Sequence, residues 1–318
     1  MNDRPIRPKL HNASLEEIRT LVRPEDWESD ISRNALDDRP FENQPPPCEC
    51  EAEILAAAPR HLEAGALDPL QLELLDVVRR DRWPIPIPED REGYCPSFDG
   101  VYWLTGLRDH LRVMEVVREH DLDVERYLDL GCASGRVLRH FCSLTEIPEL
   151  WGSDINYRHI RWLQEHLPMR VKPLFTHCIP TLPLRDASMD LVTAFSDFTH
   201  VDTYETAWLS ELRRILRPGG IAYLTVHNED TWRVLRRERN NRIVKTMAMV
   251  CPKVDSLLES ELVDGRTVYR YTEQGPYRAL VFHSDKYLRQ VWGRYFEILE
   301  ILPEHHGLQT VLVLRAPA

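Results

Sequence analysis

A glycine-rich turn between an apolar stretch and a helix-forming stretch is the part of this sequence best suited to chemistry. The turn spans residues 129–135 and contains Asp129, Gly131 and Gly135. Glycine lets backbone N–H groups approach a ligand closely, and the N-terminus of the following helix favours negative groups. A second carboxylate, Asp154, ends the next apolar stretch. In a doubly wound sheet it can accept both hydroxyls of an adenosine ribose.

Two classes of cofactor use this layout, and the glycine spacing separates them. A nicotinamide site requires Gly-x-Gly-x-x-Gly, in which the second glycine admits the pyrophosphate. Counted from Gly131, the second and third glycine positions hold Ala133 and Arg136. The spacing therefore disfavours a nicotinamide-dependent oxidoreductase, which we keep only as a third alternative.

The other pattern, Asp-x-Gly-x-x-x-Gly with an acidic residue after the next strand, fits the turn and Asp154. Here the chain resembles the class I S-adenosylmethionine-dependent methyltransferases of the small-molecule type. The resemblance covers about residues 100–318 and rests on four ordered segments. They read LDLGCASGR at 128–136, GSDI at 152–155, LPLRDASMDLV at 182–192 and WLSELRRILRPGG at 208–220.

The resemblance implies S-adenosylmethionine as the cofactor and assigns roles to individual residues. Asp154 would hold the ribose, and Ile155 would cover the adenine. The family's usual acidic partner of the adenine amino group is missing, and we predict a backbone contact from Cys178 instead. Ala133 stands where the family usually has glycine. The residues expected at the cofactor are Asp129, Gly131, Ala133, Gly135, Asp154, Ile155, Cys178, Phe195 and Ser196.

Two histidines are the candidates for acid–base catalysis. Methyl transfer from a sulfonium is an in-line displacement of an activated leaving group, so alignment supplies most of the rate and a base only removes the acceptor's proton. Histidine suits that task near neutral pH. His200 follows the fourth predicted strand and His227 ends the fifth. Each either contacts the acceptor or its proton, or packs or caps a loop. Asp197 is a third candidate, and a lone carboxylate of this kind is more often a turn residue.

No metal site is predicted. Cys48 and Cys50 are close together but have no second pair of ligands at matching spacing. His305 and His306 have no acidic partners nearby in the sequence, and we interpret them as a solvated loop before the last strand.

Alternating strands and helices from residue 126 onward indicate a parallel sheet covered on both faces. Strands are predicted over 127–130, 150–154, 171–175, 190–196 and 221–226, with helices between them. Then come a basic helix over 231–242, a hairpin around 264–265, a helix from 284, and strands over 296–302 and 308–314. The predicted fold class is α/β: a Rossmann-like, doubly wound, seven-stranded, mostly parallel sheet whose last strand is antiparallel, with an N-terminal helical extension.

Three segments are predicted along the chain. Residues 1–60 form a proline-rich N-terminal arm, partly disordered, with one short helix from Ser14. Residues 61–120 form a helical extension or lid, and residues 121–318 form the S-adenosylmethionine-binding methyltransferase domain. Within that domain, residues 240–283 are expected to be an insertion on the acceptor side.

The charge and composition exclude several functions. The 40 Lys and Arg residues against 51 Asp and Glu give a formal net charge of −11, which disfavours nucleic acid and anionic membranes as partners. The sequence has no long apolar run, no apolar region at its start, and an odd number of cysteines. These features favour a cytoplasmic protein.

The class of acceptor molecule is inferred by excluding other types of methyltransferase. A nucleobase amino-methyltransferase would carry Asn/Asp-Pro-Pro-aromatic after the fourth strand, where this chain has Ser196-Asp197-Phe198-Thr199, and the paired acidic site of metal-dependent catechol-type enzymes is missing. We therefore predict methyl transfer to a small molecule or glycan, at a hydroxyl oxygen. The alternative is a non-catalytic S-adenosylmethionine-binding or scaffold protein. A basic run is either a solvated helix face or a seat for an anionic acceptor: Arg233, Arg236, Arg237 and Arg239.

Overall fold

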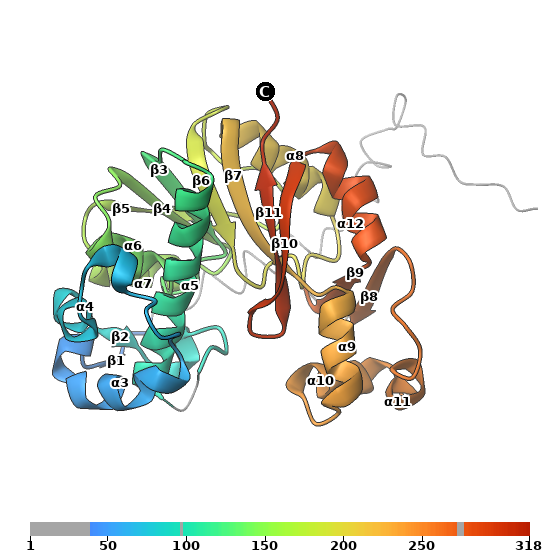
Figure 1. Cartoon of the computed structure of the whole chain (residues 1–318), viewed down its shortest axis with the longest axis horizontal. Helices are drawn as coiled ribbons and strands as arrows, with labels where there is room; N and C mark the ends of the chain where they lie inside the picture. The colour runs from blue at the N-terminus through green and yellow to red at the C-terminus, as the bar shows by residue number, and fades with distance from the viewer. Residues whose placement is uncertain (1–38, 96–97, 272–276) are drawn as a thin grey trace, which may run out of the picture.

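A seven-stranded sheet runs through the middle of the molecule (Figure 1). The structure, a computed structural model, describes residues 39–95, 98–271 and 277–318, so the helix predicted from Ser14 lies outside the described residues. The strands are β3 (Arg126–Leu130), β4 (Glu149–Asp154), β5 (Val171–Phe175), β6 (Met189–Ala194), β7 (Leu216–Val226), β10 (Glu297–His306) and β11 (Gln309–Arg315). Their order is β10-β11-β7-β6-β3-β4-β5.

The strand directions confirm the predicted Rossmann-like sheet. Strands β3 to β7 are mutually parallel. The final strand, β11, is antiparallel to both β7 and β10. The carboxyl ends of the five parallel strands therefore meet at one edge, which is where ligands bind in open α/β sheets.

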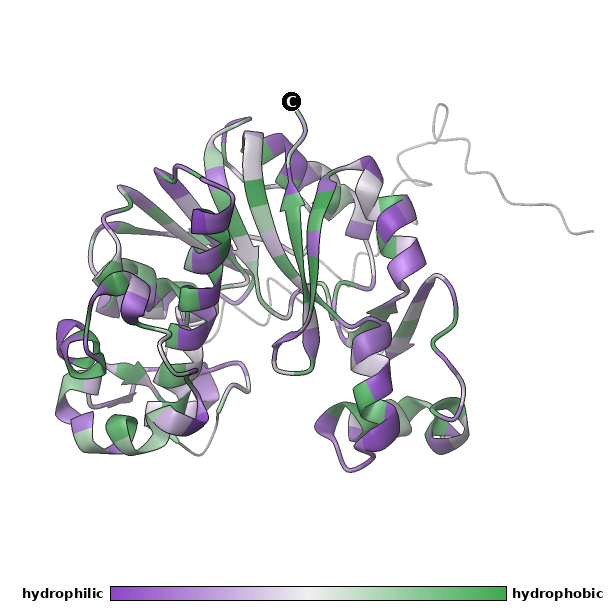
Figure 2. Cartoon of the chain, in the orientation of Figure 1, coloured by the Kyte–Doolittle hydropathy of each residue, from purple (hydrophilic) through white to green (hydrophobic). Residues whose placement is uncertain are grey.

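Helices cover both faces of the sheet, and consecutive strand residues pack on opposite faces. Tyr127 packs with α5 (Asp99–Glu119), α6 (Leu138–Leu144) and α7 (Tyr157–His166). Leu128 packs on the other face with α8 (Glu205–Ile215) and α12 (Asp285–Val291), which continues into η6 (Trp292–Arg294). The apolar central strands stand out in Figure 2. Burial on both faces explains why these strands read as nearly continuous apolar runs.

The N-terminal extension, residues 39–95, folds beside the sheet. Its elements are β1 (Asn43–Gln44), η2 (Pro47–Glu49), α3 (Glu51–Ala57), η3 (Ala58–Arg60), η4 (Asp68–Leu70), α4 (Leu74–Arg80), β2 (Ile85–Pro86) and η5 (Pro88–Asp90). Ile54 and Val77 pack on Trp103 of α5. Asp81 accepts from Arg139 at 2.6 Å, and both side chains are fully buried. The domain boundaries at residues 60 and 120 stay a prediction.

The connection between β7 and α12 differs from the prediction in two places. It contains α9 (Glu229–Arg237), α10 (Arg242–Val250), α11 (Val254–Leu257), β8 (Arg266–Arg270) and β9 (Ala279–His283). The single basic helix over 231–242 is wrong, because Asn241 accepts from the Ile243 N–H and caps a second helix. The hairpin around 264–265 is also wrong, because Gly265 lies at the open end of β8 and β9 and contacts Ser284.

The β7–α12 connection and the N-terminal extension both lie at the edge where the parallel strands end. In Figure 1 both segments lie below the sheet. The extension is on the left, and α9 to α11 are on the right together with β8 and β9. The two segments therefore flank the edge at which the glycine turn and Asp154 stand.

Gly106 permits the close contact between α5 and Arg136, which directly follows the glycine turn. A Cβ on Gly106 of α5 would overlap the carbonyl oxygen of Arg136 and lie 3.0 Å from Nε2 of His140. Backbone this close to backbone cannot yield by a rotamer change.

We expect Gly106→Ala to lower the free energy of unfolding by about 2 kcal/mol, although alanine ordinarily stabilises a helix interior relative to glycine. The control is Gly293→Ala, because a Cβ at that position would meet nothing within 4 Å. Chemical denaturation of both variants measures the effect. A Gly106→Ala variant as stable as the wild type would contradict the close contact.

Candidate functional site

The glycine turn after β3 has three residues in the left-handed region. They are Gly131 at φ +64°, Ala133 at +45° and Gly135 at +75°. A Cβ on Gly131 would overlap the carboxylate of Asp197, and one on Gly135 would lie 2.8 Å from Leu163 of α7. Gly131 is therefore required by a close side chain and Gly135 by helix packing. The positive φ of Ala133 costs about 1 kcal/mol of conformational energy, because this residue has a Cβ.

Asp154 is held in place by the turn beside it. Its two carboxylate oxygens accept from the Ala133 N–H at 2.8 Å and from the Asn156 N–H at 2.7 Å. His159 lies 3.7 Å away. Burial by itself lowers the pKa of His159, but the hydrogen bond and charge of Asp154 outweigh burial and raise it. The carboxylate thus stands rigidly at the end of β4, with lone pairs left for a further donor.

A cavity of about 480 Å³ opens at the carboxyl ends of β3, β4 and β6. Six of the predicted site residues line it: Gly131, Asp154, Ile155, Phe195, Ser196 and His200. Glu92 and Tyr94 of the extension close one side, and Tyr277 and Arg278 of the β7–α12 connection close another.

Five predicted residues lie behind this lining: Asp129, Ala133, Gly135, Cys178 and His227. Asp129 accepts from the Thr193 hydroxyl at 2.8 Å, and burial raises its pKa to about 7. The carbonyl of Cys178 accepts from the Tyr277 hydroxyl. Ala133 and Gly135 contribute backbone geometry to the turn.

The two candidate catalytic histidines have different surroundings. His227 is 1% exposed, and its ring packs 5.0 Å from that of Phe282. Burial, with His200 and His283 nearby, lowers its pKa to about 3. His200 lines the cavity, and its Nδ1 lies 2.7 Å from the carbonyl oxygen of Ala279. A carbonyl only accepts, so Nδ1 carries the proton and Nε2 keeps the lone pair of a base.

Asp197 lies over the glycine turn, which its interpretation as a turn residue did not anticipate. Its backbone carbonyl does accept turn hydrogen bonds from His200 and Val201. Its carboxylate stands against Gly131, and Oδ2 is buried without a hydrogen-bond partner among the described residues. Burial, then the charges of Asp154 and Asp129, raise the pKa of Asp197 well above its usual range. A buried carboxylate with raised pKa at a cavity wall suits a cationic ligand.

A buried polar cluster beside the cavity was missed by sequence reasoning. Asp109 of α5 contacts Arg136 at 2.6 Å and His306 at 3.0 Å. The Tyr94 hydroxyl lies 3.2 Å from Nε2 of His306 and 2.7 Å from the hydroxyl of Ser196. The solvated loop predicted for His306 is wrong, because this residue ends β10 and is buried. No local pattern could have found the cluster, since its members come from five distant parts of the chain.

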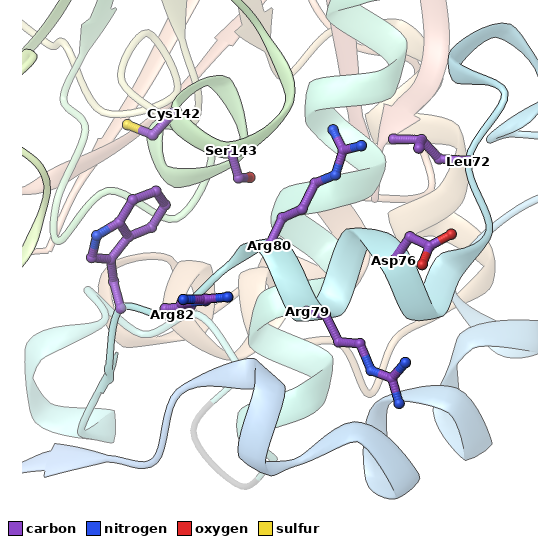
Figure 3. Close-up of a pocket in the computed structure, with 8 residues that line it drawn as sticks. Leu72, Asp76, Arg79, Arg80, Arg82, Cys142 and Ser143 are labelled. Carbon is purple, nitrogen blue, oxygen red and sulfur yellow. The ribbon is translucent and has the colours of Figure 1, made fainter.

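A separate hollow of about 580 Å³ lies on the N-terminal extension (Figure 3). Arg79 and Arg80 leave α4 in opposite directions there, and Arg79 pairs with Glu51 at 2.8 Å. Cys142 and Ser143 form its other side. None of the predicted site residues lines this hollow, so it is distinct from the cavity at the strand ends.

Across residues 39–95, 98–271 and 277–318, no group of three or more His, Cys, Asp or Glu side chains is arranged to hold a metal ion. In the same residues, no helix combines the length and the apolar character needed to cross a membrane.

Comparison with known proteins bears on the segment that contains the turn. Residues 128–220 match the family model described as a methyltransferase domain. The match runs from the middle of β3 through the turn, β4 and β6 to the first residues of β7. No curated protein matches the chain.

Many solved structures are similar to this chain, and three illustrate the likeness. A putative methyltransferase of Haloferax volcanii, in complex with a methyltransferase activator, is 18% identical, with 67% of this chain and 94% of that chain covered and a TM-score of 0.43. A SAM-dependent methyltransferase of Methanosarcina mazei is 18% identical, with 64% and 97% covered and a TM-score of 0.44. The 1,6-didemethyltoxoflavin-N1-methyltransferase of Burkholderia thailandensis is 13% identical, with 68% and 81% covered and a TM-score of 0.46.

The parallel sheet, the glycine turn and the family match define a methyltransferase domain within this chain. The matched residues, 128–220, are less than a third of the chain.

The buried pair of Asp109 and Arg136 should stabilise the fold in a pH-dependent way. Burial by itself raises the pKa of Asp109, but His306 and Arg136 outweigh it and hold the pKa well below the usual range. The stabilisation is therefore complete above the unfolded pKa of about 4 and is lost as the pH falls further. We expect Asp109→Asn to lower the free energy of unfolding at pH 7 by about 3 kcal/mol, because Arg136 is left buried without its charge partner.

Urea denaturation between pH 7 and pH 2 measures this difference, which should shrink at the acidic end. Asp255→Asn is the control, because that side chain is 84% exposed and its contact with Arg239 is 3.9 Å long. A loss of stability as small as the control's would mean that the buried pair contributes little.

Proposed function

We propose that this chain is a class I, S-adenosylmethionine-dependent methyltransferase. It acts on a small-molecule or glycan acceptor, at a hydroxyl oxygen, with His200 as the general base. The observation that carries the proposal is one cavity that combines Gly131, Asp154 and Ile155 with a histidine whose Nδ1 is bonded to a carbonyl. Its volume of about 480 Å³ lies in the usual range of small-molecule sites.

The residues of the cavity fit S-adenosylmethionine. Asp154 has lone pairs left to accept ribose hydroxyls, and Ile155 offers an apolar surface beside it for the adenine. Gly131 has no Cβ, so its backbone is uncovered on the side that faces the Asp197 carboxylate. The unpartnered Oδ2 of Asp197 is an acceptor for a cationic group. Bound S-adenosylmethionine would supply a methyl group on a sulfonium, to be taken in line by the acceptor oxygen.

His200 is set up to act on the acceptor's proton. Burial lowers its pKa, so the ring is neutral at pH 7 and Nε2 can take a proton. The Ala279 carbonyl fixes the tautomer and the ring orientation. We propose His227 as a packing residue, because it lies behind the cavity wall with a pKa of about 3.

A first test concerns the cofactor. We expect Asp197→Asn to weaken the binding of S-adenosylmethionine about tenfold, since a cationic group loses its charged acceptor. The affinity of the wild type should rise with pH above the usual carboxyl value of about 4, because the pKa of Asp197 is raised and its proton must leave before the carboxylate can pair with a cation. The variant should lack this rise.

Calorimetric titration with S-adenosylmethionine measures both effects. Asp186→Asn is the matched control, because its side chain is 80% exposed and lies outside the cavity. Equal affinities for Asp197→Asn and the control would remove Asp197 from the cofactor site.

A second test concerns the base. We expect His200→Gln to lower kcat about 100-fold, with S-adenosylmethionine affinity within about twofold of the wild type. The wild-type rate should be flat above about pH 6.5 and fall below it, because the pKa of His200 lies under that value. Transfer of labelled methyl to a panel of phenols, alcohols and sugars measures the rate.

The control for this test is His120→Gln, whose wild-type side chain pairs with Glu300 at 2.7 Å and does not line the cavity. An unchanged kcat in His200→Gln would exclude the base role. Tight cofactor binding by the wild type without transfer to any acceptor would favour the non-catalytic alternative.

A further inference from the structure

Two arginines of the cavity wall have no acidic partner within the described residues. Arg242 is the first residue of α10, and Arg278 lies just before β9. Both line the cavity that contains His200. No carboxylate among the described residues lies within 4.0 Å of either guanidinium. Arg242 also reaches across to the N-terminal extension, because a Cβ on Gly93 would lie 3.2 Å from its Nη1.

Neighbouring arginines of the β7–α12 connection behave differently. Arg233 pairs with Asp230, Arg236 with Glu261, Arg239 with Asp255, Arg266 with Glu205 and Arg270 with Asp202. The basic run considered for an anionic acceptor, residues 233–239, is therefore largely paired and lines no part of the cavity. Among the residues of this segment that line the cavity, the positive charge without a carboxylate partner in the described residues lies at Arg242 and Arg278.

The carboxylates of the cavity do not offset these charges. Glu92 faces His159 at 3.6 Å. Asp154 is already bonded to two backbone N–H groups. Asp197 has a raised pKa and faces Gly131. S-adenosylmethionine carries two positive groups and one negative group, so its binding adds one net positive charge to the cavity.

The two arginines are close enough to His200 to act on the same ligand. Both of their charges lower the pKa of His200. Aromatic side chains also line this cavity. The Trp208 indole N–H donates to the Tyr277 hydroxyl at 2.6 Å, which fixes that ring at the cavity wall. A fixed aromatic ring in the same cavity as two arginine side chains suits a planar, negatively charged molecule.

We propose that the acceptor is an oxyanion: its carboxylate or phosphate group binds Arg242 and Arg278, and its hydroxyl meets His200. This proposal rests on the proposed function and names the class of acceptor for the same cavity. Arginine presents a planar fork of donors that matches carboxylate and phosphate oxygens. The positive charge needed by the acceptor is thus supplied inside the cavity, although the chain as a whole is acidic.

The test uses the full chain with saturating S-adenosylhomocysteine and three probes: 4-hydroxybenzoate, phenyl phosphate and the neutral 4-hydroxybenzamide. Thermal unfolding measures stabilisation by each probe. We expect at least one anion to raise Tm, with the amide shifting it by less than a third as much. The two anions distinguish a carboxylate acceptor from a phosphate acceptor.

Arg242→Gln and Arg278→Gln should each reduce the shift given by the anion at least threefold, while the affinity for S-adenosylhomocysteine stays within twofold. Arg237→Gln is the matched control, an exposed arginine of the same segment that lies outside the cavity. It should keep the full shift.

Four results would overturn the proposal. They are no shift with either anion, an equal shift with the amide, an undiminished shift in the double arginine variant, and loss of S-adenosylhomocysteine affinity in the arginine variants. The last would mean that the arginines hold the cofactor carboxylate. If the wild type does not bind S-adenosylhomocysteine at all, the proposed function is contradicted instead. The Tm shift given by the anions in the absence of S-adenosylhomocysteine distinguishes that failure from failure of the oxyanion proposal.

Discussion

The buried ion pair between Asp109 and Arg136 is the contact on which the rest of the site depends. Arg136 immediately follows the glycine turn, and Asp109 lies in α5. His306 brings the end of β10 to the same carboxylate, and the Tyr94 ring lies 4.3 Å from the Arg136 guanidinium. One carboxylate therefore fixes the turn, the extension and the last hairpin relative to one another. The cost of burying these charges is offset only because each finds a partner.

Two segments outside the sheet give the site its individual character. The extension contributes Glu92 and Tyr94 to the cavity, and the β7–α12 connection contributes Arg242, Tyr277 and Arg278. The sheet edge between them carries the turn and Asp154, which are the parts the fold supplies to any chain built this way. Such a division, with a shared edge and variable walls, is how one fold supports many acceptors.

Much of the sheet could be predicted from the sequence, because strands buried on both faces are apolar throughout. The prediction for β5 matches residue for residue. The walls could not be predicted in this way. The break between α9 and α10 depends on the side chain of Asn241, and the burial of His306 depends on Asp109 far away in the chain. The location of His200 could be predicted because the ends of parallel strands meet at one edge of the sheet. The position of Asp197 over the glycine turn could not be predicted, because it is evident only from the contact with Gly131.

The buried contact of Arg139 with Asp81 bears on how modular this protein is. Arg139 lies inside the family-matched segment 128–220, but both Asp81 and Asp109, the partners of Arg139 and Arg136, lie before it. Excision at the family boundary would remove both carboxylate partners together with the residues that cover the two guanidinium groups, so the family-matched segment and the smallest autonomous folding unit do not coincide. The extension is therefore part of the same cooperative structure as the sheet, rather than an appendage fused to a self-sufficient core.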